Sequence, residues 1–190
     1  MKTNMMHRLG AVAAALLLSV GIAAAGSAPQ AALPGTSQDL AKKVRHEIVM
    51  YPHYTIWDNI GFRVDQGNVE LTGAVTEPYK KSDLTKIIQR IPGVTNVTNE
   101  LEVLPLSSMD NQLRMQVARA IYRDPMLSRY GMGALPSIHI IVDNGHVSLE
   151  GVVSTPADKQ IAGMRASSAG LSFGAVTNNL QVEHPAAKKG

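Results

Sequence analysis

The chain has 190 residues, of which 45% are hydrophobic and 17% charged, and it contains no cysteine, which excludes disulfides and thiolate chemistry. The formal net charge is +3, but residues 1–25 include Lys2 and Arg8 and no acid. Removing these two from the 18 basic residues leaves 16 against 15 acidic ones, a net charge of about +1. Such a nearly neutral chain is a poor candidate for binding nucleic acid, which needs many net positive contacts.

Residues 1–25 combine a basic start, an apolar run and a terminal Ala-Ala-Ala. This pattern predicts a secretory signal peptide, cleaved after Ala25 or, as alternatives, after Ala28 or Ala32. A retained membrane anchor is the other interpretation, but the run is short for a span and lacks a basic stop-transfer cluster. We therefore expect an exported, periplasmic protein, soluble or peripherally bound to a membrane, with a flexible leader over residues 26–36.

A first amphipathic helix is expected to begin at residues 36–37, where Thr or Ser can cap it. Leu40, Val44 and Ile48 follow at i, i+4 and i+8, the spacing of one helix face, and Pro52 lies beyond its end. Pro78 opens a second helix. Its expected inner residues are Leu84, Ile87, Ile88 and Ile91. Its expected outer residues are Lys80, Lys81, Lys86 and Arg90.

A seven-residue motif, Gly-x-Val-x-Leu-x-Gly, occurs at residues 67–73 and again at residues 145–151, each time after an alternating apolar run. Asn-Gly at residues 144–145 is a strong signal for a two-residue hairpin turn. In that register Val142 faces Val147, Ile140 faces Leu149 and Ile138 faces Gly151, so all apolar residues share one face. The same register in the first copy pairs Val64 with Val69, Phe62 with Leu71, Ile60 with Gly73 and Arg63 with Glu70. Gly67, Gly73, Gly145 and Gly151 are the predicted structural hairpin residues.

The closing strands also repeat, as Val-Thr-Asn-Glu-Leu-Glu-Val at residues 97–103 and Val-Thr-Asn-Asn-Leu-Gln-Val at residues 176–182. Alternation predicts that Val97, Leu101 and Val103 point to one side. In the second copy, Ser108 or Asp110 is expected to cap the first helix. The second helix of this copy, from Pro156, is expected to turn Ile161 and Met164 inward. The order helix, strand, strand, helix, strand therefore occurs twice, which predicts an α+β protein of two tandem αββαβ units.

These motifs resemble the BON domain, a module named for bacterial osmotic-stress and nodulation proteins. The resemblance covers a first domain at 37–105 and a second at 108–184, followed by a polar tail at 185–190, as in periplasmic dual-BON proteins. It implies that each unit is a small three-stranded mixed sheet with two helices on one face. It also implies a non-enzymatic protein that attaches to phospholipid membranes and supports envelope integrity or osmotic-stress tolerance. The second copy departs from the first at residues 169–175, where the first has Ile-Pro-Gly-Val at residues 91–94.

The first helix of the second unit is the predicted lipid contact. A stripe of Gln112, Gln116, Arg119 and Arg123 has helical spacing, with tyrosine and methionine beside it. Arginine next to such side chains suits an anionic headgroup surface, although a solvated basic face is the simpler interpretation. The residues expected to contact lipid are Arg114, Arg119, Arg123, Tyr122, Met126, Arg129 and Tyr130.

Three aromatic residues in one loop, Tyr51, Tyr54 and Trp57, suggest an alternative function as a protein-protein interaction module of an envelope or secretion complex. The same loop could instead fold back over a core. The outer sheet faces, with Arg63 and Glu70 in one unit and His139, Ile141 and Glu150 in the other, are candidates for the surface where the units meet. Ile141 favours a covered surface because it is apolar on a polar face.

We find no constellation that supports catalysis and expect no cofactor. His139, His146 and Glu150 suggest a metal site at first sight. However, His146 lies four strand positions from Glu150, roughly 13 Å at about 3.3 Å per residue, which is too far for one ion. The glycine motifs precede no helix start and are not phosphate loops.

Overall fold

The computed structural model describes residues 34–169 and 176–183. The predicted signal peptide, most of the leader, the polar tail and residues 170–175, where the second copy departs from the first, lie outside the described residues. Among the described helices, none has the length and apolar character needed to cross a bilayer.

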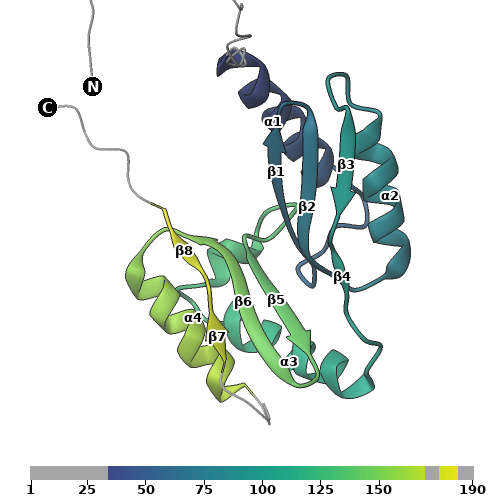
Figure 1. Cartoon of the computed structure of the whole chain (residues 1–190). Coiled ribbons are helices and arrows are strands. Elements are labelled where there is room, and N and C mark those ends of the chain that lie inside the picture. The colour runs from purple at the N-terminus through teal and green to yellow at the C-terminus, as the bar shows by residue number, and fades with distance from the viewer. Residues whose placement is uncertain (1–33, 170–175, 184–190) are drawn as a thin grey trace, which may run out of the picture. The chain divides into compact units, whose positions relative to one another are not determined.

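The first repeat is a mixed sheet with both of its helices on one face (Figure 1). Its elements are α1 (Pro34–Val49), β1 (Asn59–Asp65), β2 (Asn68–Val75), α2 (Pro78–Gln89), β3 (Asn96–Asn99) and β4 (Glu102–Val103). β1 pairs antiparallel with β2, and β3 and β4 both pair parallel with β2. The core lies between the sheet and the helices, where Val44, Leu71 and Ile88 are fully buried.

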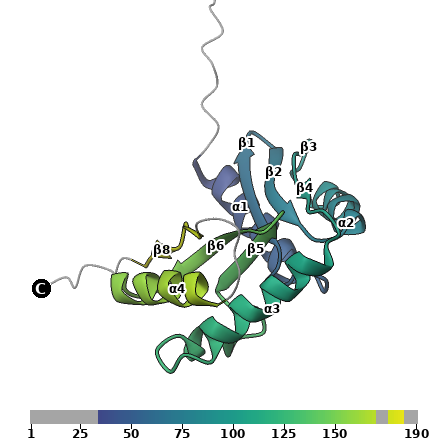
Figure 2. The ribbon, with the colours of Figure 1, turned by 90° about the horizontal axis from the view of Figure 1, so that it is seen from below.

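The second repeat has the same plan, and α3 and α4 lie on one face of its sheet (Figure 2). Its elements are α3 (Ser108–Tyr122), the 3-10 turn η1 (Ser128–Gly131), β5 (Ile138–Asp143), β6 (His146–Val153), α4 (Pro156–Ser168), β7 (Thr177–Asn178) and β8 (Gln181–Val182). The expected α+β class and the duplicated unit are therefore confirmed. Ser107, rather than Ser108 or Asp110, caps α3 by accepting a hydrogen bond from the backbone of Asp110.

Both hairpins have the predicted register. Ile140 lies opposite Leu149 and Phe62 opposite Leu71, so the apolar residues of each ribbon face its helices. The alternation specifies this register because a slip of one residue would turn every apolar side chain to the other face.

The hairpin turns require left-handed backbone at both central positions. Gln66 and Asn144 have φ of 46° and 48°, and the glycines after them, Gly67 and Gly145, have φ of 86° and 80°. This geometry matches the right-handed twist of the flanking strands. The glycines that close the motif have φ of 108° at position 73 and 111° at position 151.

The third strand of each repeat is interrupted, and an asparagine fixes the break. Asn99 donates from Nδ2 to the carbonyl of Lys81 on α2, and its Oδ1 accepts from the backbone of Leu101. Asn178 makes the equivalent bonds to Lys159 on α4 and to Leu180. The break shifts the alternation, so the predicted inward position of Val103 is wrong: this residue is exposed and Leu104 is buried instead.

The inner face of α4 consists of small residues. Ala162 and Ala166 are buried, at the positions that Leu84 and Ile88 take in α2. The prediction that Met164 points inward is wrong, because its side chain is 63% exposed. The spacing of Asp158, Ala162 and Ala166, each four residues apart, sets the buried face of this helix instead.

Gly151→Ala tests the backbone requirement of the hairpin. A Cβ at this position would lie 2.1 Å from the carbonyl oxygen of Ser137, in a left-handed conformation. We expect the free energy of unfolding, measured by urea denaturation, to fall by about 1–3 kcal/mol. Gly133→Ala is the control, because its Cβ would meet no atom closer than 3.3 Å and it lacks a positive φ. Equal stability of the two variants would contradict the role given to Gly151.

Candidate functional site

The outer side of α3 and the turn after it carry exposed arginine and methionine side chains. Arg119 and Arg123 are exposed, and Met115 and Met126 are 47% and 52% exposed. We call Met115, Arg119, Arg123 and Met126 the basic methionine face. The described salt bridges of this repeat join other arginines and include neither Arg119 nor Arg123. Both guanidinium groups are therefore available to an anion from solution.

Two of the residues predicted to contact lipid are buried. Arg114 is 5% exposed, and its Nη2 donates to the carbonyl of Val142 at 2.7 Å. Tyr130 donates from its hydroxyl to Asp158 at 2.8 Å and accepts from the backbone of Ser154. Burial removes Arg114 and Tyr130 from any surface that a membrane could touch.

Two more of the seven predicted contacts, Tyr122 and Arg129, have polar groups that are bonded within the protein. The hydroxyl of Tyr122 donates to the carbonyl of Ile138, and burial raises the pKa of Tyr122 further above its ordinary value. Arg129 is half exposed, but its Nη2 lies 2.5 Å from Oδ2 of Asp158. Of the seven predicted residues, the structure therefore leaves Arg119, Arg123 and Met126 exposed, whereas the other four are bonded within the protein.

The acids of α3 and α4 are turned inward. Asp110, the one acid of α3, accepts hydrogen bonds from the backbone of Asn144 and Gly145 at the hairpin turn. Asp158, the one acid of α4, is buried against Tyr130 and Arg129. Neither helix therefore presents an exposed carboxylate beside the basic methionine face.

Asp124, directly after α3, is also buried and binds Arg165 of α4. Its Oδ2 lies 2.7 Å from Nε of Arg165. Hydrogen bonds from the backbone of Met126 and from Arg165 hold the pKa of Asp124 below its usual range. The pair ties α4 to the end of α3 and leaves the outer part of Arg165 half exposed near the same surface.

The helices of the first repeat differ in charge. α1 carries Asp39 and α2 carries Asp83, whose side chains are accessible to solvent. These acids form i,i+3 pairs with Lys42 and Lys86. Exposed acids and bases are thus mixed on the helical side of the first repeat, so it is a weaker candidate for an anionic surface.

The aromatic loop of the first repeat is used inside the protein. Tyr51 is buried in the first core, and Trp57 packs against the core of the second repeat. The backbone carbonyl of Ile56 accepts a hydrogen bond of 2.7 Å from the amide of Ile140 in β5. Tyr54 stacks on His139, with ring centroids 5.3 Å apart. We call residues 54–58 the junction loop, because they connect the two repeats through these contacts.

A buried ion pair that the sequence did not suggest holds the junction loop. Nζ of Lys80 lies 2.7 Å and 3.0 Å from the two carboxylate oxygens of Asp58, and both side chains are buried. Thr55 and Thr76 each donate two further hydrogen bonds to this carboxylate. Burial acts to raise the pKa of Asp58, but the bonds from Lys80, Thr76 and Thr55 outweigh it and lower the pKa. The predicted outward orientation of Lys80 is therefore wrong.

The second repeat has an equivalent cluster in which the acid comes from the helix. Lys80 and Asp158 are each the third residue of their helices, α2 and α4. In the second repeat Tyr130 and Arg129 of the preceding loop supply the partners. Aligning the two copies would have identified both residues. Lys80 and Asp158 occupy the same position, two residues after the proline that begins each helix.

Lys80→Met tests the buried pair. The substitution leaves Asp58 buried without its cation, so we expect a loss of about 3–5 kcal/mol in the free energy of unfolding, measured by urea denaturation. Lys86→Met on the exposed side of the same helix is the control and should change stability by about 0.5 kcal/mol or less. A loss at Lys80 no larger than at Lys86 would contradict the structural role of the pair.

The chain matches a known family twice. A model of the BON domain aligns with residues 36–105 and again with residues 109–184. Two structures of CdsD, a structural protein of the type III secretion system of Chlamydia trachomatis, are 14% identical to this chain. The alignment covers 77% of this chain and 94% or 98% of the CdsD chain, at a TM-score of 0.28. A search of curated proteins found no match.

Proposed function

The chain belongs to the BON domain family, and from this premise we propose that it is an exported, non-enzymatic module that attaches to anionic phospholipid membranes. The basic methionine face of the second repeat would make the contact. We further propose that attachment supports the integrity of the cell envelope under osmotic stress. The observation that carries the proposal is the sorting of side chains on α3 and α4, which turn their acids inward and, apart from the buried Arg114, their arginines and methionines outward.

This sorting fits the two layers of a membrane surface. Arg119 and Arg123 can bind lipid phosphates, each contributing about 1 kcal/mol near an anionic leaflet. Met115 and Met126 are unbranched and flexible, so they can enter the boundary between headgroups and acyl chains. All five methionines of the second repeat are exposed, at positions 109, 115, 126, 132 and 164. The contact is thus amphipathic, with weak electrostatic attraction supplemented by apolar burial.

The alternative of a protein-binding aromatic loop requires side chains that a partner can reach. Tyr51 is buried, and Tyr54 and Trp57 pack against the second repeat. No observation of the described residues favours this alternative over the lipid contact. Binding a partner through these side chains would require the junction loop to move away from β5.

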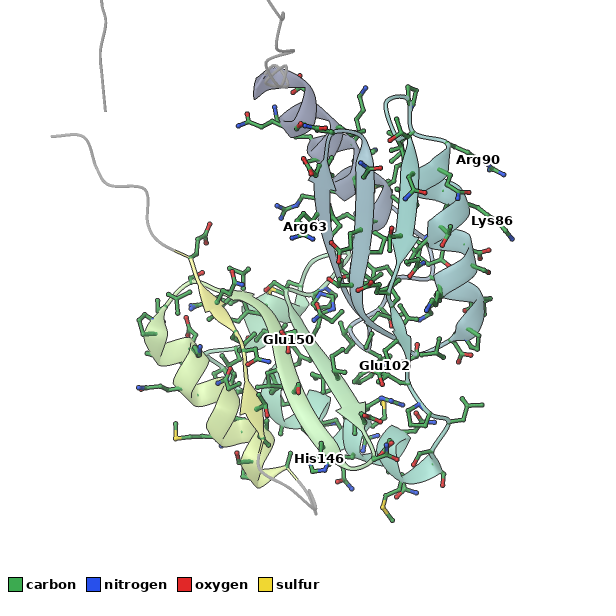
Figure 3. The ribbon with its side chains drawn as sticks, in the orientation of Figure 1. Arg63, Lys86, Arg90, Glu102, His146 and Glu150 are labelled. Carbon is green, nitrogen blue, oxygen red and sulfur yellow. The ribbon has the colours of Figure 1, made fainter. Side chains whose placement is uncertain are left out.

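Charge reversal on α3 tests the electrostatic part. In co-sedimentation with phosphatidylglycerol vesicles, the chain from Gly26 onward with Arg119→Glu and Arg123→Glu should bind at least about tenfold more weakly than wild type, because four charge units change. Lys86→Glu with Arg90→Glu is the matched control, since Lys86 projects from α2 of the first repeat and Arg90 from its C-cap (Figure 3). The control should bind like wild type. Equal loss in the two double variants would overturn the assignment to the second repeat, and no binding by wild type would overturn the function.

Replacing the exposed methionines distinguishes insertion of their side chains into the membrane from attraction between charges alone. Met115→Gln with Met126→Gln keeps both arginines but lowers the apolar area that can enter the membrane. We expect roughly tenfold weaker binding, in contrast to Val49→Gln with Met50→Gln, two exposed apolar residues at the end of α1 that should not matter. The comparison is made in moderate salt, where screening weakens the charge contribution. Unchanged binding of the Met115/Met126 variant would show that methionine insertion plays no part.

A further inference from the structure

The contact between the junction loop and β5 has a histidine at its centre. His139 of β5 is 7% exposed and stacks on Tyr54 with an angle of 18° between the rings. The next residue, Ile140, donates its amide hydrogen to the carbonyl of Ile56. Among the described residues, Nδ1 of His139 is buried and has no hydrogen-bond partner. The neutral ring is therefore held mainly by packing, with main-chain groups of Thr55 and Asp58 beside it.

The charged groups around His139 offer no ready partner for a second proton. Asp58 is the nearest acid of the junction loop, but Lys80 and the two threonines already occupy its oxygens. Glu150 is the cross-strand neighbour of His139 on β6, and it accepts a hydrogen bond from Asn179. Arg114 of α3 adds a positive charge in the field of Asp58. The junction thus has two acids and two bases near the ring, and the acid closest to it is neutralised.

We propose that this junction is an acid-sensitive latch, in which protonation of His139 releases the junction loop from β5. A charged imidazolium would have to stay under Tyr54 away from water, or the loop must open to hydrate it. Opening breaks the bond between Ile56 and Ile140 and frees Trp57 from the second core, while the ion pair of Asp58 stays within the first repeat. Acid would therefore uncouple the repeats and expose the aromatic residues without unfolding either sheet.

The sign of the effect follows from the burial of the ring. Burial lowers the pKa of His139, and it outweighs the opposite influence of main-chain groups of Asp58 and Thr55 and of the carboxylates of Asp58 and Glu150. The closed latch consequently binds a proton less readily than the open one, whose histidine has an ordinary pKa near 6.5. The stability of the closed latch is complete above that pH and declines as the pH falls below it.

Amide hydrogen exchange at Ile140 measures the latch directly. Uptake of one proton on opening predicts that its protection factor, corrected for the intrinsic rate, falls by up to about tenfold per pH unit between about pH 6.5 and 5. The emission of Trp57, the one tryptophan of the chain, should shift to longer wavelength over the same range. The amide of Leu71, in the core of the first repeat, should keep its protection and so report that the sheet is intact.

His139→Phe is the decisive variant, because it keeps a ring on Tyr54 that cannot take a proton. Its Ile140 protection should not depend on pH over this range, whereas the control His146→Gln, exposed at the hairpin tip, should behave like wild type. A pH-independent wild type, or an unchanged pH dependence in His139→Phe, would overturn the latch. If the variant fails to fold, the NMR titration of His139 in wild type decides: a pKa below 6.5 supports the latch, and one at or above 6.5 rejects it.

Discussion

The buried carboxylate of Asp58 is the interaction on which the connection between the repeats depends. An isolated charge in this position would be very costly, and the structure compensates it with Lys80 and with paired donors from Thr55 and Thr76. These bonds come from both sides of the first hairpin, so they fix the loop that precedes β1. From that fixed loop Ile56 reaches β5 and Trp57 reaches the second core. The buried carboxylate of Asp58 therefore fixes the loop residues that contact the second repeat.

The two repeats share a fold but differ in what they expose. The first presents a mixture of acids and bases on its helices, and its aromatic residues are engaged in its own core and at the junction. The second buries Asp110, Asp124 and Asp158 and leaves Arg119, Arg123 and its methionines outside. Duplication of a unit of this size allows one copy to serve as a stable support while the surface of the other changes. In this account the first repeat positions the second, and the second meets the membrane.

Much of the fold could be predicted from the sequence because it depends on periodicity. Strict alternation around Val64 and Val142 determined the register of both hairpins, since one face of each ribbon is buried. The stripe containing Arg119 and Arg123 was correctly assigned to the outside of a helix. Arg114 could have been separated from it by the same rule, because it lies two positions from Gln112 and Gln116 and therefore on nearly the opposite side. The asparagine that interrupts the third strand acts through side-chain hydrogen bonds, which alternation does not describe.

Contacts between distant, non-periodic positions were not predictable in this way. Asp58 and Lys80 are 22 residues apart, in a loop and on a helix, and neither belongs to an apolar pattern. A lysine near the start of an amphipathic helix normally lies in solvent, so only a specific acid beneath it explains its burial. The inner face of α4 was misassigned because its buried residues are alanines, whose signal is weaker than that of Met164 beside them.

Hydrogen–deuterium exchange of the protein with and without phosphatidylglycerol vesicles tests the proposed membrane contact most directly. We expect vesicles to slow exchange in α3 and in the turn around Met126, while α1 and α2 exchange as they do in solution. Protection confined to the helices of the first repeat, or spread equally over both repeats, would contradict the proposed contact.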